Sequence, residues 1–236
     1  MKIEMHVHTR FSKDSLLPLH ILLIRCKLKK IDCIAITDHN EVKGALVAKR
    51  LFEKHNVKVI VGEEIFSKNG EIIGLFLKEK INEGLSAEDT IDQIRKQDGI
   101  VYVPHPYDVK RHKTVLQYEK ILENNDQIDL IECYNGRNIE EKYGIRQNEI
   151  ANEINKTKVI GSDAHTWFEI GKNTMEISEF KNTNEFLNVM KNAKFNKRKC
   201  IKFAHNVTKV DKLLKMIIKG DWHGISRVII KKFRRS

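Results

Sequence analysis

Short β-branched runs alternate with longer amphipathic stretches along most of the chain, and this alternation limits the possible folds more than any other feature. Seven runs are typical of strands: residues 2–8, 32–37, 57–62, 71–77, 100–104, 128–134 and 157–162. Apolar residues recur at helical spacing near 17–30, 41–55, 86–97, 113–124 and 139–155. Strands that alternate with helices predict a parallel sheet covered by helices. Seven strands, several of them apolar throughout, favour a closed barrel over an open sheet.

One junction departs from this alternation. The sequence SKNG at residues 67–70 is typical of a turn, and it joins two strand runs with no helix between them. No Gly-x-Gly-x-x-Gly motif follows the first strand, so a dinucleotide site has no support. The length of 236 residues is close to the ~250 residues typical of a barrel of β/α units.

Cysteine usage and hydropathy bear on the compartment. The longest apolar runs are far shorter than the ~18 residues that span a membrane, and the first residues lack the apolar segment of a signal peptide. The four cysteines form no Cys-x-x-Cys pair and are scattered at Cys26, Cys33, Cys133 and Cys200. These features predict a cytoplasmic protein with reduced thiols and no transmembrane segment.

Two histidines fall on one face of the first strand run. Alternate residues of a strand share a face, so His6 and His8 lie on the side opposite Met5 and Val7. They would be roughly 6.5 Å apart at ~3.3 Å per residue, and imidazoles at that spacing can converge on one metal ion. A single His-x-His pair is weak evidence, because chance can also place two histidines in a strand.

Other apolar runs end in the same residue types. They end in Asp38-His39, Glu63-Glu64, His105-Pro106 and Asp163-Ala164-His165. In a β/α barrel the carboxyl ends of the strands meet on one face, where active sites are built. Five of the ten histidines lie at these ends, which predicts a polynuclear metal site. The other five are expected to be solvated or to cap helices: His20, His55, His112, His205 and His223.

Six motifs together resemble those of a known family. The stretches HVHTRFS…D, ITDHN, GEEI, VPHPYD, ECYNGR and GSDAHT are similar, in order, to the motifs of the PHP (polymerase and histidinol phosphatase) family, over roughly residues 1–175. The resemblance implies an α/β fold, a distorted (β/α)7 TIM-like barrel. It also implies two to three divalent metal ions (Mn, Zn, Fe or Mg) and hydrolysis of phosphoester bonds.

The same resemblance implies which side chains hold the metals. Carried over motif by motif, the ligands are His6, His8, Asp14, His39, Glu64, Glu71, His105, Asp163 and His165. Catalytic roles fall to Glu64, Asp163 and His165. Glu64 is similar to the carboxylate that bridges two metals, and it is chosen over Glu63 because it takes the third place of a G-x-E pattern.

Two positions depart from the pattern of the family. Many members carry a histidine where this chain has Glu71. A glutamate there would favour Mn²⁺ or Mg²⁺ over an imidazole-rich zinc site, unless its side chain points away. Asp14, expected to serve a third metal with His39 and His165, comes one residue later than in the common version.

The implied reaction is hydrolysis of a phosphoester by a metal-activated hydroxide, phosphatase-like or nuclease-like. The substrate would be a phosphorylated small molecule or a nucleic acid, such as a nucleotide or an oligonucleotide. Arg137 and Tyr107 are candidates for substrate binding, with a surface arginine and a packing tyrosine as equal alternatives. Two other functions stay open: an amidohydrolase-type C–N hydrolase, and a non-catalytic nucleic-acid-binding barrel.

The end of the sequence differs in character from the rest. The formal net charge is +11, and basic residues cluster after about Lys194, although a compositional bias explains the overall charge equally well. We expect a barrel over residues 1–193 and a basic, helical extension over 194–236, packed on the barrel. Two alternatives for the extension are steering of a polyanion toward the metals and binding to anionic lipid through RVIIKKFRRS.

Overall fold

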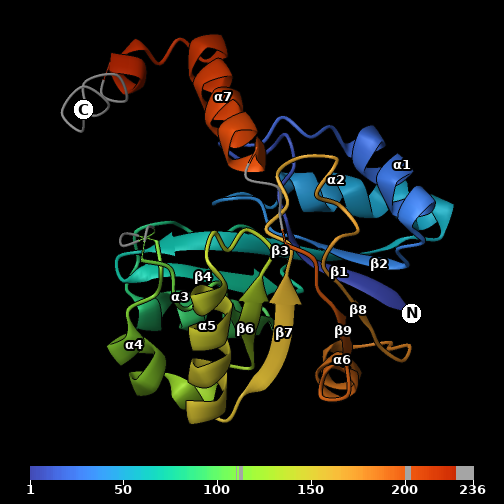
Figure 1. The fold of residues 1–236 in the computed structure, drawn as a ribbon, viewed down its shortest axis with the longest axis vertical. Coiled ribbons are helices and arrows are strands. Elements are labelled where there is room, and N and C mark those ends of the chain that lie inside the picture. Colours follow the sequence, from blue (N-terminus) through green and yellow to red (C-terminus); the bar gives the residue numbers. More distant parts are fainter. Residues whose placement is uncertain (110, 112–113, 200–202, 227–236) are drawn as a thin grey trace.

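The apolar runs form one sheet in the computed structural model, which describes residues 1–109, 111, 114–199 and 203–226. In the described part of the chain the strand order is β7-β6-β5-β4-β3-β2-β1-β8-β9 (Figure 1). The strands are β1 Lys2–Val7, β2 Cys33–Ile36, β3 Lys58–Ser67, β4 Gly70–Leu75, β5 Ile100–Val103, β6 Leu130–Asn135, β7 Thr157–Gly161, β8 Thr174–Glu176 and β9 Lys194–Asn196. The expected barrel of alternating strands and helices is confirmed.

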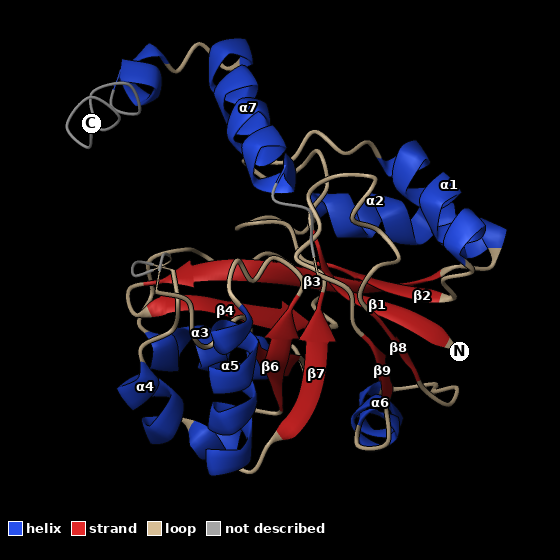
Figure 2. Cartoon of the chain, viewed as in Figure 1, coloured by secondary structure: helices blue, strands red, loops and turns tan. Residues whose placement is uncertain are grey.

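The helices are α1 Leu19–Lys29, α2 Lys43–Phe52, α3 Ala87–Arg95, α4 Tyr118–Glu123, α5 Glu141–Glu153, α6 Thr183–Met190 and α7 Phe203–Ile218, with short 3-10 turns at Glu53–His55 and Asn125–Gln127. The helices before α7 lie around the outside of the sheet, whereas α7 projects away from it (Figure 2). The start of α3 is fixed by Ser86, whose Oγ accepts a hydrogen bond from the Asp89 amide at 3.0 Å. None of the described helices has both the length and the apolar character needed to cross a membrane.

The turn at residues 67–70 reverses the direction of the sheet. β1, β2 and β3 are parallel, as are β5, β6 and β7, but β4 is antiparallel to both of its neighbours. The reversal therefore brings the beginning of β4 to the edge where the parallel strands end. Glu71, the second residue of β4, reaches the same face as the strand ends for this reason.

β1 closes the barrel by pairing differently along its length. Its first residues, Lys2 and Ile3, pair with β8. Further along, the Met5 carbonyl accepts a hydrogen bond from the Ser162 amide at 3.0 Å, just after β7. The strand is irregular between these two parts, and His6 has a positive φ of 63°. The sheet is consequently a nearly closed barrel from which β8 and β9 diverge.

Three elements lie outside the expectations from sequence. β8, β9 and α6 follow the seventh predicted strand, and β9 begins at Lys194, so the sheet continues past residue 193. The division of the chain at residues 193 and 194 stays a prediction. The tail is helical in α7 and again over residues 222–226, whereas residues 227–236, which are the RVIIKKFRRS stretch, lie outside the described residues. Cys26, Cys33 and Cys133 are buried and free, as expected, and Cys200 lies outside the described residues.

Candidate metal centre

The nine predicted ligands meet on one face of the barrel. They come from the end of β1, from within β3, from the start of β4, and from the segments after β1, β2, β5 and β7. All are buried except the side chains of His39 and Asp14, which are 9% and 14% exposed. Backbone φ is positive at His6, His105 and Asp163, so three of the nine lie in a conformation that costs energy and clusters at functional sites.

The ligand atoms form four overlapping groups. Within each group one nitrogen or oxygen from every member lies within 4.8 Å of the others. The groups are His8, Asp14, His39 and His165; His6, Glu64 and His105; His6, His8 and Asp163; and His39, Glu64 and Glu71. Because these groups share members, they outline one polynuclear site.

Glu64 belongs to two of the four groups and lies close to histidines of the other two. Its Oε1 is 3.3 Å from His6 Nε2 and 3.0 Å from His105 Nε2. Its Oε2 is 3.3 Å from His8 Nε2 and 3.1 Å from His39 Nδ1. One carboxylate thus faces four imidazoles, the position that a bridging ligand would need.

The remaining carboxylates surround this centre. Asp163 Oδ1 is 3.5 Å from His8 Nε2. The two oxygens of Asp14 lie 3.3 Å from His39 Nε2 and 3.4 Å from His165 Nε2. Glu71 points into the cluster: its Oε1 is 3.6 Å from His39 Nδ1.

The donor set fits divalent metal ions. Four buried atoms that face the cluster have no hydrogen-bond partner among the described residues: His6 Nε2, His8 Nε2, His39 Nδ1 and Glu64 Oε2. A buried polar atom without a partner costs folding free energy. Several such atoms in one place therefore indicate that a ligand binds there. Imidazole nitrogens mixed with carboxylate oxygens suit Zn, Mn or Fe.

The charges of the cluster set its protonation. Burial lowers the pKa of His6, but the surrounding carboxylates, Glu64 first, outweigh it and hold the pKa well above the usual value. Burial raises the pKa of Glu64, yet His6 and His39 hold it well below its usual range. Burial, followed by neighbouring imidazoles, lowers the pKa of His8 to about 3. Glu64 is therefore ionised and His8 neutral, the states in which both bind metal.

Glu132 supports the cluster and was missed from the sequence. Its Oε1 lies 3.0 Å from His6 Nδ1 and accepts from the Tyr102 hydroxyl at 2.5 Å. Its Oε2 accepts from the His105 amide at 2.7 Å and from Asn135 Nδ2 at 2.8 Å. A carboxylate behind a ligating imidazole fixes the orientation of the ring. The available signal was a glutamate inside the apolar strand run IDLIECY.

Two arginines lie at the edge of the cluster. Arg111, also missed from the sequence, donates from Nη2 to Asp163 Oδ2 at 2.6 Å, and its side chain is 25% exposed. Arg137 is buried: its Nε and Nη2 donate to Glu169 at 2.8 Å each, and Nη2 also donates to Thr208 Oγ1. Arg137 is therefore not a surface arginine, and Arg111 is the more accessible of the two cations.

Tyr107 and His205 lie beside this edge. Tyr107 is half-buried, and its ring centroid is 5.9 Å from that of Tyr143 in an edge-to-face contact. Its part in substrate binding stays a prediction. His205 is half-buried rather than solvated, and burial, followed by Arg137 and Arg111, lowers its pKa.

Three buried carboxylates stay out of the cluster. Glu63 Oε2 accepts from the Ile81 amide at 2.9 Å, on the opposite side of β3 from Glu64, which agrees with the choice of Glu64 as the predicted ligand. Asp38 accepts from the Thr9 amide and hydroxyl at 2.5 and 2.7 Å. Glu4 accepts from the Gly171 amide at 2.8 Å.

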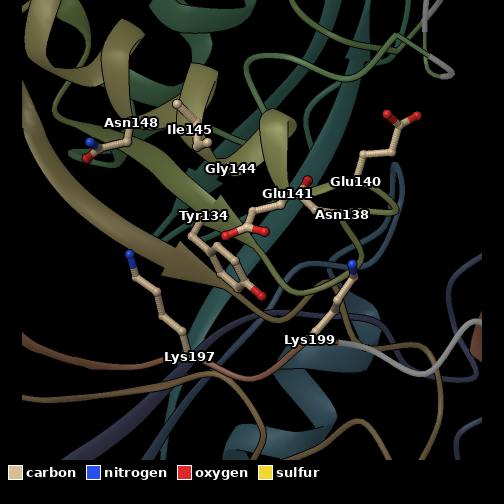
Figure 3. A pocket seen from close by; sticks show the side chains of 9 residues that line it. All are labelled: Tyr134, Asn138, Glu140, Glu141, Gly144, Ile145, Asn148, Lys197 and Lys199. Carbon is tan, nitrogen blue, oxygen red and sulfur yellow. The ribbon is translucent and has the colours of Figure 1, made fainter.

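A separate cavity of about 560 Å³ lies beside β6 and the start of α5 (Figure 3). Tyr134 lines it, together with Lys197 and Lys199 and with Glu140 and Glu141. None of the nine predicted ligands lines this cavity. Its lining has as many carboxylates as ammonium groups, so its charge does not favour the binding of an anionic phosphate.

An α/β barrel with this cluster of histidines and carboxylates on one face matches a family model. The PHP domain model matches residues 4–224, and the chain belongs to the PHP domain family. Two uncharacterised proteins of Methanocaldococcus jannaschii are similar in sequence. MJ0417 is 31% identical over 233 residues, 94% of this chain and 89% of its own length. MJ1587 is 42% identical over 117 residues, 45% of this chain and 68% of its own length.

A solved structure shares the fold. It is a two-domain protein from Bacteroides vulgatus that contains a predicted PHP-like metal-dependent phosphoesterase, with a TM-score of 0.69 and 18% identity. The match covers 83% of this chain, and this chain spans 65% of that protein's length. At this identity the likeness shows the fold alone.

Proposed function

We propose that the protein is a metal-dependent hydrolase of phosphoester bonds. The observation that carries the proposal is the convergence of nine histidine and carboxylate side chains in four overlapping groups around Glu64. The phosphoester is chosen as the bond because the PHP-like protein from Bacteroides vulgatus, which shares the fold, is named a predicted metal-dependent phosphoesterase.

The nine side chains would hold two to three divalent ions, and such ions lower the pKa of bound water and polarise phosphoryl oxygens. Glu64, Asp163 and His165 have the catalytic roles in this proposal. Glu64 belongs to two of the four ligand groups, and Asp163 and His165 each belong to a group that contains His8. Glu132 orients the ring of His6 and accepts a hydrogen bond from the backbone amide of His105.

Arg111 would orient the substrate. Its guanidinium lies between Asp163 and solvent, and a guanidinium binds phosphate through paired hydrogen bonds. Burial raises the pKa of Asp163. The nearby Arg111 and His6 lower it by more, so the pKa lies well below its usual range. We propose a phosphorylated small molecule, a nucleotide or an oligonucleotide as the substrate.

The test is turnover of p-nitrophenyl phosphate, bis-p-nitrophenyl phosphate, nucleotides and a short oligonucleotide, each with Mn²⁺, Mg²⁺, Zn²⁺ or Fe²⁺. Glu64→Gln should lower activity by about 100-fold or more and reduce bound metal. Glu63→Gln is the matched control, because it removes a buried carboxylate from the next residue without touching the cluster. Absence of bound metal after loading would remove the basis of the proposal.

The same panel separates the other two functions. A C–N hydrolase would turn over amides and cyclic imides and leave all phosphoesters intact. A non-catalytic nucleic-acid-binding barrel would bind the oligonucleotide without hydrolysing any substrate in the presence of any metal. Loss of turnover in Glu63→Gln equal to that in Glu64→Gln would show that the substitutions act on folding.

A further inference from the structure

One face of α7 holds the helix against the barrel. Thr208 Oγ1 accepts from Arg137 Nη2 at 2.8 Å, and Asp211 Oδ2 accepts from the Leu16 amide at 3.2 Å. One turn further on, Lys215 Nζ donates to the Arg10 carbonyl at 2.6 Å. These contacts lie three or four residues apart, so they define a single side of the helix. Figures 1 and 2 show α7 projecting from the body of the protein on the side toward which β6 and β7 point.

The remaining faces of α7 expose an apolar surface. Besides Phe203 at its start, the large exposed side chains of the helix are Val210, Leu213, Leu214, Ile217 and Ile218, and Trp222 follows just beyond it. Ile218 is 77% exposed and Trp222 is 69% exposed. Large apolar side chains gathered on one exposed helix indicate an interaction site, whereas scattered ones do not.

The charges on α7 specify the kind of partner. Lys209, Lys212 and Lys219 are exposed on or directly after the helix, and in the part of the chain that the structure describes none of them forms an ion pair. The single acidic residue of α7 is Asp211, which is already bonded to the Leu16 amide. The partner must therefore supply the negative charge as well as an apolar environment.

We propose that α7 binds the surface of an anionic phospholipid bilayer. Ile217, Ile218 and Trp222 would enter the boundary between headgroups and acyl chains, about 5–10 Å deep, while the lysines contact the phosphates. A nucleic acid would pair with the lysines but leave the apolar side chains in water. A second copy of this chain would cover the apolar side chains but bring a second set of lysines beside the first.

The first experiment is sedimentation of the full chain with vesicles of phosphatidylcholine and phosphatidylglycerol in equal parts. We expect binding that disappears with phosphatidylcholine alone. Ile218→Asp should weaken binding by about tenfold or more. Leu28→Asp is the matched control, because Leu28 is 68% exposed on α1 and the substitution adds the same charge there. Lys212→Gln with Lys219→Gln should weaken binding roughly 20- to 30-fold, at roughly fivefold per lysine.

Lys43→Gln with Lys49→Gln is the charge control, since both lysines are exposed on α2. Trp222 emission should shift to shorter wavelength with anionic vesicles in a Trp167→Phe background, which leaves Trp222 as the sole tryptophan. Unchanged melting temperatures would show that the variants remain folded.

Three results would overturn the proposal. The protein could stay in the supernatant with anionic vesicles. Leu28→Asp could weaken binding as much as Ile218→Asp. Sedimentation velocity without lipid could show a dimer that Ile218→Asp converts to a monomer, which would assign the apolar surface to a second copy. None of these results depends on phosphoester hydrolysis, so the binding experiment and the test of the proposed function are independent.

Discussion

Among the nine predicted ligands, Glu71 reaches the cluster from the beginning of a strand. It begins the antiparallel β4, and its two oxygens lie 3.6 Å from His39 Nδ1 and 3.6 Å from His105 Nε2. Burial and then Glu64 raise its pKa, because two carboxylates in one site disfavour double ionisation. A bound cation would relieve this repulsion.

Substitution of Glu71 should therefore change the metals. We expect Glu71→Ala to reduce the metal content by one ion and to lower activity, because the group with His39 and Glu64 loses its second carboxylate. Glu71→His should retain activity and shift the preference from Mn²⁺ or Mg²⁺ toward Zn²⁺. Elemental analysis and turnover with each metal check both. Unchanged metal content and rate in Glu71→Ala would show that Glu71 is not a ligand.

A second residue-scale prediction concerns pH and Glu4. Burial raises the pKa of Glu4 from 4.5 to about 8, so the folded protein holds a proton that the unfolded chain releases at lower pH. Between these two values the unfolded state binds fewer protons, and the stability of the wild type falls as pH rises. Relative to the wild type, Glu4→Gln should gain stability over this window, by at most about 5 kcal/mol.

Urea unfolding of both proteins from about pH 5 to about pH 9 measures this difference. The difference between the free energies of unfolding of the two proteins at each pH removes the contribution of the metal cluster, because the cluster titrates in both proteins. A difference that stays constant across the window would show that Glu4 is ionised in the folded protein.

At the scale of elements, the β3–β4 hairpin delivers Glu64 and Glu71 to the same site. Its turn requires a glycine: Gly70 has φ of 129°, and a Cβ there would lie 2.4 Å from Leu116 Cα. The segment around Leu116 covers the turn through hydrogen bonds from Glu71 N to Thr114 O at 2.7 Å and from Gln117 N to Asn69 O at 3.0 Å.

Gly70→Ala should destabilise the protein by about 3 kcal/mol or more, because a strained φ and a backbone clash act together. It should also lower metal content, since Glu71 is the next residue. Gly84→Ala is the control: Gly84 also has a positive φ, 79°, but nothing lies within 4 Å of the added Cβ, so the cost should be about 1 kcal/mol. Equal changes in melting temperature would contradict the role of the clash.

The sequence predicted the long periodic elements and missed three short ones: β8, β9 and the eight-residue helix α6. The first seven strands and five helices have long apolar or amphipathic runs, whereas β8 and β9 are TME and KFN. Strands of three residues take their conformation from the strand they pair with, here β1 for β8, and not from their own residues.

The same distinction applies to the site. Most ligands follow a repeated pattern, a histidine or carboxylate at the end of an apolar run. This pattern predicts from the sequence that they lie on one face of the barrel. Glu132 and Arg111 act through partners 126 and 52 residues away, His6 and Asp163, and no local pattern reveals such contacts. The irregular backbone at His6 was likewise invisible, because it results from the split pairing of β1.

For the whole molecule, the cluster should link metal binding to stability. Four predicted ligands are carboxylates held close together, and bound cations stabilise such a folded state selectively. A metal at 100 times its dissociation constant adds about 2.7 kcal/mol, which corresponds to roughly 5–10 °C in melting temperature. Calorimetry of chelator-treated protein with and without Mn²⁺ checks this, and Glu64→Gln should abolish most of the shift. Identical transitions with and without every metal tested would contradict it.

The split pairing of β1 has a consequence for biosynthesis. His6 and His8 leave the ribosome well before Asp163 and His165, by roughly 8–30 s at the usual rate of translation. Until the later segment emerges, β1 lacks the neighbour at Ser162 and Ala164 that completes its pairing. A bare pair of imidazoles on a nascent chain prefers copper or zinc to manganese. With Glu64 and Asp163 as ligands, discrimination between metals would require the chain to be synthesised beyond residue 165, so that both carboxylates are in place.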